Sequence, residues 1–262
     1  MNTLISAGAL SYKQLTHFMH DGIEKVCIFS ADPRAVNEVY WFTQKNKPVE
    51  LLNLHISKEG GLKKLKLFNH DLISSEFSAD GIKDIFQSLE EIQEIDVETV
   101  TLEKAIQKVS LKPSDENHLL INTLGSECHH LDALTFEQLI LFKKIYICCD
   151  RDKLFSNSDT DEKLIEFLLN KGFYKKRFFI DYPCAVIEFE FNEKSYVTRI
   201  HIENQCLKAE NEEIQRRQGM LVAELKKAEL QVELIKEMLL DEEQYHRLDN
   251  VQNHAEQNDS EY

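Results

Sequence analysis

The feature that most constrains this chain is a seven-residue repeat of apolar residues toward its C-terminal end. Two interleaved series make up the repeat, namely Leu207, Ile214, Leu221, Ala228 and Ile235, and then Leu225, Val232 and Leu239. Apolar residues at two positions of a seven-residue period are typical of a helix that supercoils with a partner. The stretch contains no proline and its only glycine is Gly219. The sequence therefore predicts a coiled-coil helix that joins copies of this chain or binds a partner protein.

The N-terminal half of this repeat is more polar than the C-terminal half. Its second series consists of Asn204, Asn211 and Gln218. Polar residues at such positions weaken a coiled coil but can fix its register and its number of strands. Three further leucines widen the apolar face away from the seam: Leu230, Leu234 and Leu240. They leave open a coil of more than two helices, packing against another protein, or a single amphipathic helix that packs on its own domain.

Composition narrows the classes of function. The chain has 262 residues, of which 42% are hydrophobic, and a formal net charge of −15. This hydrophobic content is enough for a packed core. Lysine and arginine form no basic stripe, so we expect no nucleic-acid ligand. The sequence has neither a signal-peptide pattern nor an apolar run long enough to span a bilayer. Six cysteines without a Cys-x-x-Cys pair fit reduced thiols, so we expect a cytoplasmic protein.

Short apolar runs alternate with helical patterns over the first 190 residues. We expect strands over residues 3–7, 25–30, 49–56, 62–68, 95–101, 119–123, 145–149, 177–181 and 185–191. We expect helices over residues 12–20, 33–45, 82–89, 102–109, 128–143 and 161–171. This alternation predicts an α/β fold with a mostly parallel sheet, covered on both faces, and an antiparallel pair at one edge. The expected parts are an α/β domain over 1–195, a coiled-coil helix over 196–248 and a disordered tail over 249–262.

Four segments at the expected strand ends and turns resemble a known enzyme family. They are residues 6–12 (SAGALSY), 29–33 (FSADP), 121–127 (INTLGSE) and 171–173 (KGF). In their order they are similar to the signatures of FkbM-type S-adenosylmethionine-dependent methyltransferases, over about residues 3–192. The resemblance implies a Rossmann-like methyltransferase fold with seven strands, S-adenosylmethionine as the cofactor, and O-methylation of a glycan or cell-surface saccharide.

The resemblance also implies which residues would hold the cofactor. They are Gly8, Ala9, Ser30, Asp32 and Asn122. Gly8 and Ala9 match the family's first turn, where the backbone approaches the cofactor closely. The family's acidic positions are occupied here by Ser6, Ser30, Asn122 and Leu124. Asp32 would replace the missing ribose ligand only if its loop bends inward. Otherwise Asp32 caps a helix that has Pro33 in its first turn.

The candidate catalytic residues are Glu127, His129 and His130. Methyl transfer to a hydroxyl needs the two groups aligned and a base that removes the proton, and histidine titrates near neutral pH. With Cys128 these residues also offer metal-ligating groups. Neighbours at one helix start point in different directions, however, so we predict no metal site. A polar, partly exposed helix start is the other interpretation. Cys148 and Cys149 either react as thiols or belong to a buried strand.

Two functions from different classes follow. The first is an S-adenosylmethionine-dependent methyltransferase that acts on a glycan hydroxyl and is oligomerised by the coiled coil. The second is a methyltransferase-like scaffold that has lost catalysis and acts through the coiled coil. Fold alone does not separate them. The replaced acidic residues favour the scaffold, while the family resemblance favours the enzyme.

Overall fold

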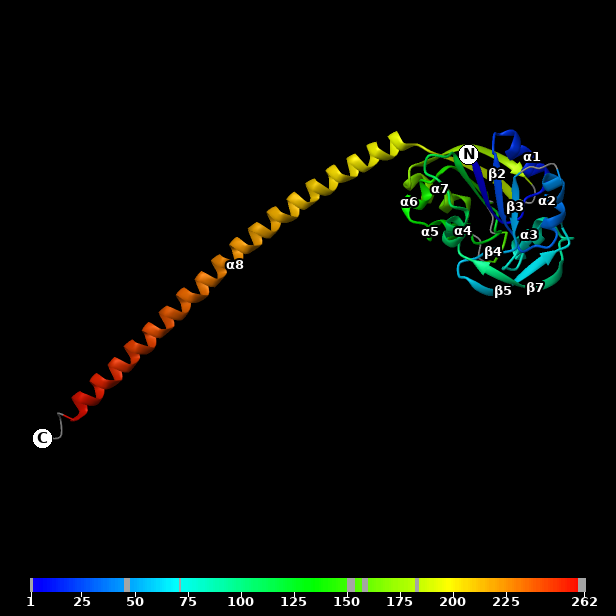
Figure 1. Cartoon of the computed structure of the whole chain (residues 1–262). Coiled ribbons are helices and arrows are strands. Elements are labelled where there is room, and N and C mark those ends of the chain that lie inside the picture. Colours follow the sequence, from blue (N-terminus) through cyan, green and yellow to red (C-terminus); the bar gives the residue numbers. More distant parts are fainter. Residues whose placement is uncertain are drawn as a thin grey trace. The chain divides into compact units, whose positions relative to one another are not determined.

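A computed structural model describes residues 2–44, 48–70, 72–149, 154–156, 160–181 and 184–258. The chain divides into two units, Met1–Tyr196 and Val197–Tyr262. The first is a mixed α/β unit and the second belongs to a long helix (Figure 1). Each unit is described separately below.

The main sheet of the α/β unit has seven strands. They are β1 (Thr3–Ala7), β2 (Lys25–Phe29), β3 (Val49–Leu52), β8 (Asn117–Ile121), β9 (Phe142–Cys149), β10 (Phe173–Asp181) and β11 (Cys184–Phe191). Their order in the sheet is β10-β11-β9-β8-β1-β2-β3. The pairs from β3 to β9 are parallel, and β11 is antiparallel to both β9 and β10. The prediction of a mostly parallel sheet with an antiparallel edge is confirmed.

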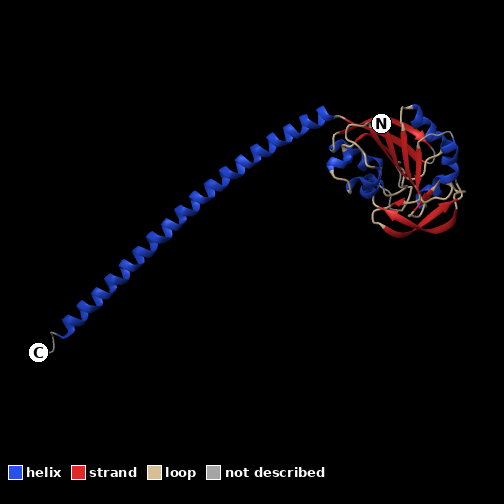
Figure 2. Ribbon diagram, in the orientation of Figure 1, coloured by secondary structure: helices blue, strands red, loops and turns tan. Residues whose placement is uncertain are grey.

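Seven helices accompany the sheet within the described part of this unit. They are α1 (Tyr12–His20), α2 (Ala35–Gln44), α3 (Asp80–Ile85), α4 (Leu102–Val109), α5 (Glu127–Asp132), α6 (Phe136–Leu139) and α7 (Asp161–Asn170). Figure 2 shows the red strands of the main sheet between two groups of helices. Several helix starts follow from local sequence. Ser11, for example, caps α1 through its hydroxyl, and Gln14 completes a capping box.

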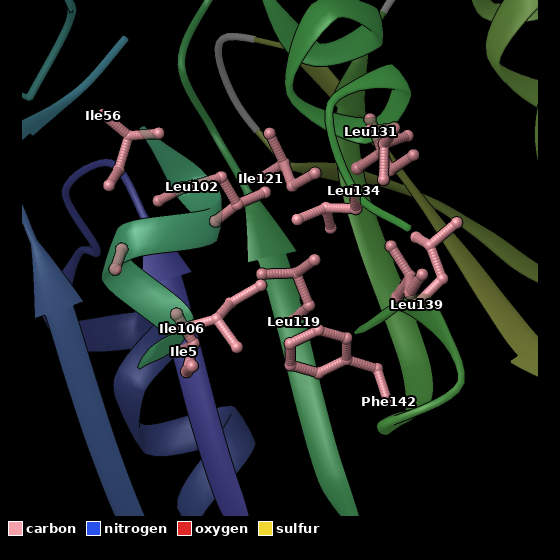
Figure 3. Packing of buried hydrophobic residues seen from close by; sticks show 14 of the residues in the cluster. Ile5, Ile56, Leu102, Ile106, Leu119, Ile121, Leu131, Leu134, Leu139 and Phe142 are labelled. Carbon is pink, nitrogen blue, oxygen red and sulfur yellow. The ribbon is translucent and has the colours of Figure 1, made fainter. Parts of the chain in front are cut away.

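Alternation along the strands builds two apolar cores, one on each face of the sheet. Leu4 and Leu120 belong to one cluster, while their neighbours Ile5 and Leu119 belong to the other. Successive strand residues point to opposite faces, so each apolar strand serves both cores. Figure 3 shows the second cluster, in which the side chains of α4 lie over those of β1 and β8.

A second, four-stranded sheet was absent from our sequence expectations. It consists of β4 (His55–Ile56), β5 (Gly61–Phe68), β6 (Ser74–Ser75) and β7 (Glu91–Val100), in the order β4-β7-β5-β6. The single strand predicted over 49–56 is wrong, because the chain turns at its middle. The Leu52 carbonyl accepts hydrogen bonds from the amides of both Ser30 and Leu54. The first half of the predicted strand therefore stays in the main sheet, and the second half joins the second sheet.

The single helix predicted over 128–143 is also wrong. The chain leaves α5 and begins α6 at Thr135, which has extended backbone angles. Its hydroxyl accepts the Gln138 amide, while the Gln138 side chain accepts the Thr135 amide. This capping box starts a new helix. The apolar period of residues 128–143 continues across the break, so the period alone predicted one helix.

The long C-terminal helix α8 (Glu193–Asn258) runs for 66 residues. Asn192 precedes it and accepts the Ser195 amide through its side chain, as an N-cap does. The helix starts three residues before the predicted boundary and includes residues 249–258, which we expected to lie in a disordered tail. Residues 259–262 lie outside the described residues. Among the described residues, no helix combines the length and apolar character needed to cross a bilayer.

Candidate functional site

The turn after β1, where the family resemblance places the cofactor, is held closely by the neighbouring strands. Gly8 has φ +112°, and its amide donates to the Phe29 carbonyl of β2 at 2.9 Å. A Cβ atom on Gly8 would lie 2.0 Å from the backbone oxygen of Asn122. Glycine is therefore required here because the ends of β1 and β8 approach each other, whether or not a ligand binds.

Asn122 closes this turn from the β8 side. Its amide donates to Ala7 at 2.7 Å, and its side-chain Nδ2 donates to the Ala9 carbonyl at 3.1 Å. Its Oδ1 is buried and has no hydrogen-bond partner among the described residues. The structure thus brings together Gly8, Ala9 and Asn122, three of the residues that the resemblance implied for cofactor binding. Their hydrogen bonds join the ends of β1, β2 and β8.

Asp32, the expected ribose ligand, is buried and fully engaged. Its Oδ1 accepts the amide and the Nε of Arg34, both at 2.9 Å, and its Oδ2 accepts Nη2 of the same arginine at 2.6 Å. Ser30 accepts the Asp32 amide through its hydroxyl. The Arg34 guanidinium also donates to the carbonyls of Phe68, His70 and Ile73. Asp32 therefore fixes an arginine that links the end of β2 to the second sheet.

A group of polar side chains gathers where the loop after β8 meets the second sheet. We call it the buried polar cluster, and it consists of His55, Ser57, Lys63, Glu76, Thr123, Ser126, Glu127 and His130. Two contacts hold the loops together here. Ser75 donates its hydroxyl to the Leu124 carbonyl at 2.8 Å, and Gly125 packs against Phe77 so closely that a Cβ would lie 2.8 Å from that ring.

The half of the cluster on the β8–α5 loop and α5 contains two buried titratable groups, both in α5. Glu127 accepts the Gly125 amide at 3.0 and 3.2 Å, and Thr123 lies 3.4 Å from its Oε1. Burial outweighs these hydrogen bonds and raises the pKa of Glu127 to about 7. His130 lies with Nε2 2.7 Å from the Ser126 hydroxyl. Burial, followed by the nearby His55, lowers the pKa of His130 to about 3. At neutral pH the imidazole of His130 is therefore uncharged.

The half of the cluster on the second sheet is ionic. Glu76 lies 3.3 Å from His55 Nε2 and 3.2 Å from Lys63 Nζ, and Lys63 also donates to Ser57 at 2.7 Å. Burial acts to raise the pKa of Glu76. Hydrogen bonds from His55, Ser57 and Lys63 outweigh it and lower that pKa to about 2. Glu76 is consequently ionised, and its charge opposes the effect of burial on His130.

The structure separates the three predicted catalytic residues. Glu127 and His130 lie in the buried polar cluster, whereas His129 is exposed. Within the described part of the chain, no group of three His, Cys, Asp or Glu residues is placed to hold a metal ion. Chemically, the cluster offers a carboxyl that exchanges a proton near neutral pH beside a neutral imidazole bonded to a hydroxyl. Such groups can act as acid or base if a substrate reaches them.

Sequence reasoning missed His55 and Glu76. His55 lay within a predicted strand and Glu76 in a stretch without a clear pattern, and each is more than 45 residues from Ser126 along the chain. The second sheet brings His55 and Glu76 close to α5, and the sequence around each residue does not predict that contact. Cys148 and Cys149 are buried within β9, one in each apolar cluster. Arg151 and Lys153, the basic residues near them in sequence, lie outside the described residues.

Comparison of the sequence with protein-family models and with curated proteins finds no match.

Proposed function

We propose that this chain is a methyltransferase-fold protein whose function is assembly through α8 rather than methyl transfer. The surface of α8 carries this proposal. Its seam residues are between 45% and 64% exposed in the single chain: Leu207, Ile214, Leu221, Leu225, Val232, Ile235 and Leu239. A partner helix over this seam would remove that apolar surface from water, which stabilises association by about 25 cal/mol per Å².

The length of α8 supports the same proposal. Helices in proteins draw most of their stability from the packing of an apolar face rather than from helix propensity. The seam of α8 repeats over five heptads, long enough for a stable coiled coil. A helix of this design reaches its full stability when a second helix covers the seam.

The fold of the α/β unit supports the methyltransferase part of the proposal. Seven strands, mostly parallel and with one antiparallel strand next to the edge, agree with the Rossmann-like fold that the sequence resemblance implies. The contacts of Asp32 support assembly over catalysis. A cofactor ribose at Asp32 would compete with the guanidinium of Arg34, which also donates to the Phe68 carbonyl at the end of β5 and to the His70 and Ile73 carbonyls of the loop that follows.

One observation favours a second function, S-adenosylmethionine-dependent O-methylation of a glycan hydroxyl. Glu127 lies five residues beyond Asn122, near the same edge of the sheet as the turn after β1. Its pKa of about 7 suits a general base at neutral pH. Glu127 would remove the hydroxyl proton of the acceptor while the methyl group is transferred. Its present hydrogen bonds to Gly125 and Thr123 would have to loosen first.

Sedimentation equilibrium of the full chain tests assembly. We expect a mass of at least twice the 30.6 kDa of one chain, independent of added cofactor. A single-chain mass at all concentrations from micromolar to submillimolar would contradict self-association through α8.

Calorimetric titration with S-adenosylmethionine and S-adenosylhomocysteine separates the two functions. We expect no binding at millimolar cofactor, because the Asp32 carboxylate is already bound by Arg34 through both of its oxygens. Binding at micromolar cofactor would overturn the assembly-only proposal and leave the methyltransferase. In that case Glu127→Gln should keep cofactor binding and lose methyl transfer.

A further inference from the structure

The polar residues of the α8 seam restrict the direction and register of helix pairing more than its apolar residues do. In heptad notation the series Leu207, Ile214, Leu221, Ala228 and Ile235 occupies position d. Position a holds Asn204, Asn211 and Gln218, followed by Leu225, Val232 and Leu239. The d series is thus apolar throughout, whereas the a series begins with three consecutive amides. All three amide residues are exposed in the single chain, so a partner must bury them.

The amides discriminate between the two directions in which a second copy can pair. In a parallel pair without stagger, each a residue faces the same residue of the partner helix. Asn204, Asn211 and Gln218 then each meet an identical amide, which both donates and accepts hydrogen bonds. In an antiparallel pair, a residues face d residues, and every d residue from Leu207 to Ile235 is apolar. Each amide would then be buried without a partner, which is costly.

The same residues select one register among the parallel ones. Sliding one helix by a heptad would set Gln218 against Leu225 and leave Asn204 against Val197 of the other copy. Only the unstaggered pairing matches all three amide layers. Asparagine at position a also favours two strands over three or four.

Charged residues flank the seam in both halves of this arrangement. In the unstaggered parallel pair, Glu203 of one helix lies beside Lys208 of the other, an attractive contact. Glu224 lies beside Glu229 of the other helix, a repulsive contact. That repulsion falls between the apolar layers of Leu221, Leu225 and Ala228, where burial of the seam opposes it.

We infer that two copies of this chain pair through α8 as a parallel, unstaggered coiled coil, specified by the amide layers of Asn204, Asn211 and Gln218. The inference rests on the proposed function, since it requires self-association through α8. It brings the two Glu193 residues, at which the α/β units are attached, to the same end of the coil.

Disulfide trapping in the full chain tests the direction and register. The parent is Cys206→Ser, which removes the exposed thiol of α8. Asn211→Cys in this parent places two thiols at one a layer, within the Cα separation of about 4.4–6.8 Å that a disulfide spans. Ala209→Cys, on the outer face two residues earlier, is the matched control. After mild oxidation we expect Asn211→Cys to migrate almost entirely as a linked dimer, and both the control and the parent to stay unlinked.

The outcomes separate this inference from the proposed function. A dimer by sedimentation in which Asn211→Cys fails to link would overturn the parallel register and leave assembly through α8 intact. A mass of three or four chains would overturn the two-stranded pair alone. A single-chain mass would overturn both.

A second variant examines the role of the amides directly. Asn211→Leu makes one amide layer apolar. The preference for two strands should then weaken, while the buried apolar area of the seam increases. We expect a higher melting temperature of the helix and a mixture of masses that includes more than two chains. An unchanged, purely dimeric mass would contradict a role of Asn211 in setting the number of strands.

Discussion

In the α/β unit, leucine and isoleucine side chains are covered by other parts of the same chain, whereas in α8 they face water. Leu4 and Ile5 of β1 are fully buried, while Leu225 of α8 is 62% exposed. The two regions have the same kinds of apolar residue and differ in the period at which these recur. Apolar residues that alternate along strands pack into two cores within one chain. Apolar residues with a seven-residue period form a seam along a helix, which another helix can cover.

The two regions should also differ in how their stability depends on protein concentration. The stability of the α/β unit should depend on single contacts inside the chain and not on protein concentration. The stability of α8 should depend on concentration, because in the proposed assembly its partner is another molecule. Each of the following predictions alters one of the two regions.

The largest effect is expected from a charge in the seam. Leu225→Asp places a carboxylate at an a layer in the apolar half, so its ionised form would be buried without a partner. We expect complete loss of self-association by sedimentation, with the melting temperature of the α/β unit unchanged. Leu230→Asp is the matched control, since Leu230 is equally exposed at 59% but lies off the seam. Equal dissociation by both variants would show that the seam is wider than a two-stranded pair.

A glycine in the α/β unit should show the opposite pattern. Gly8→Ala places a Cβ 2.0 Å from the Asn122 oxygen and should lower the free energy of unfolding by at least about 4 kcal/mol. Gly22→Ala is the control, because Gly22 also has positive φ but has nothing within 4 Å of an added Cβ. It should cost roughly 1–2 kcal/mol from backbone strain alone. Chemical denaturation measures both, and a similar loss in the two variants would contradict the close approach of β1 and β8.

Removal of the Arg34 side chain should come next in size. Arg34→Met leaves the buried carboxylate of Asp32 without its cation, which typically costs about 3–5 kcal/mol. The double variant Asp32→Asn with Arg34→Met should recover part of that loss, because no buried charge remains. Urea titrations of the two single variants and the double variant give the coupling. Additive losses would mean that the pair contributes little.

The smallest effect depends on pH. The pKa of Glu127 is raised from 4.5 to about 7 in the folded state, so the folded state holds its proton more tightly than the unfolded chain. Its contribution to stability is therefore present at low pH and is lost as pH rises from about 4.5 to about 7. Glu127→Gln resembles the protonated acid and should be more stable than the parent above pH 7, by up to about 3 kcal/mol.

The free energy of unfolding of Glu127→Gln must be compared with that of the parent at each pH. His118 and His130 have pKa values lowered to about 4 and about 3, chiefly by burial. Their contributions are lost as pH falls below about 6.5, which opposes the effect of Glu127 between about pH 4.5 and 6.5. The difference between Glu127→Gln and the parent cancels both histidines. A difference that does not change with pH would contradict a pKa of Glu127 that is raised in the folded state.

Much of the α/β fold could be predicted from local pattern. The predictions for residues 3–7, 12–20 and 102–109 coincide with β1, α1 and α4. The errors occur where tertiary contacts override an apolar run. The chain turns after Leu52 because strand β2 ends beside it, and α5 stops because Thr135 caps a new helix. In both places the residues remain apolar, so hydrophobic period alone does not reveal the break.

In the candidate site, too, some features could be predicted from the sequence and others could not. The turn at Gly8 could be located because glycine after a buried strand signals a close backbone approach. The role of Asp32 could not be settled, since the sequence does not show that the side chain of Arg34 turns back onto the Asp32 carboxylate. His55 and Glu76 could not be found, because the second sheet that brings them to Ser126 gives no signal near either residue.

The place of β1 in the middle of the main sheet bears on how the protein is made. Thr3–Ala7 pairs with β2 on one side and with β8, more than 100 residues later, on the other. During synthesis β1 therefore leaves the ribosome with one edge that cannot pair until residue 121 has emerged. Such an edge is prone to wrong pairing with other nascent chains. The interval between the emergence of β1 and that of β8 should therefore be the stage at which folding of this unit most needs a chaperone.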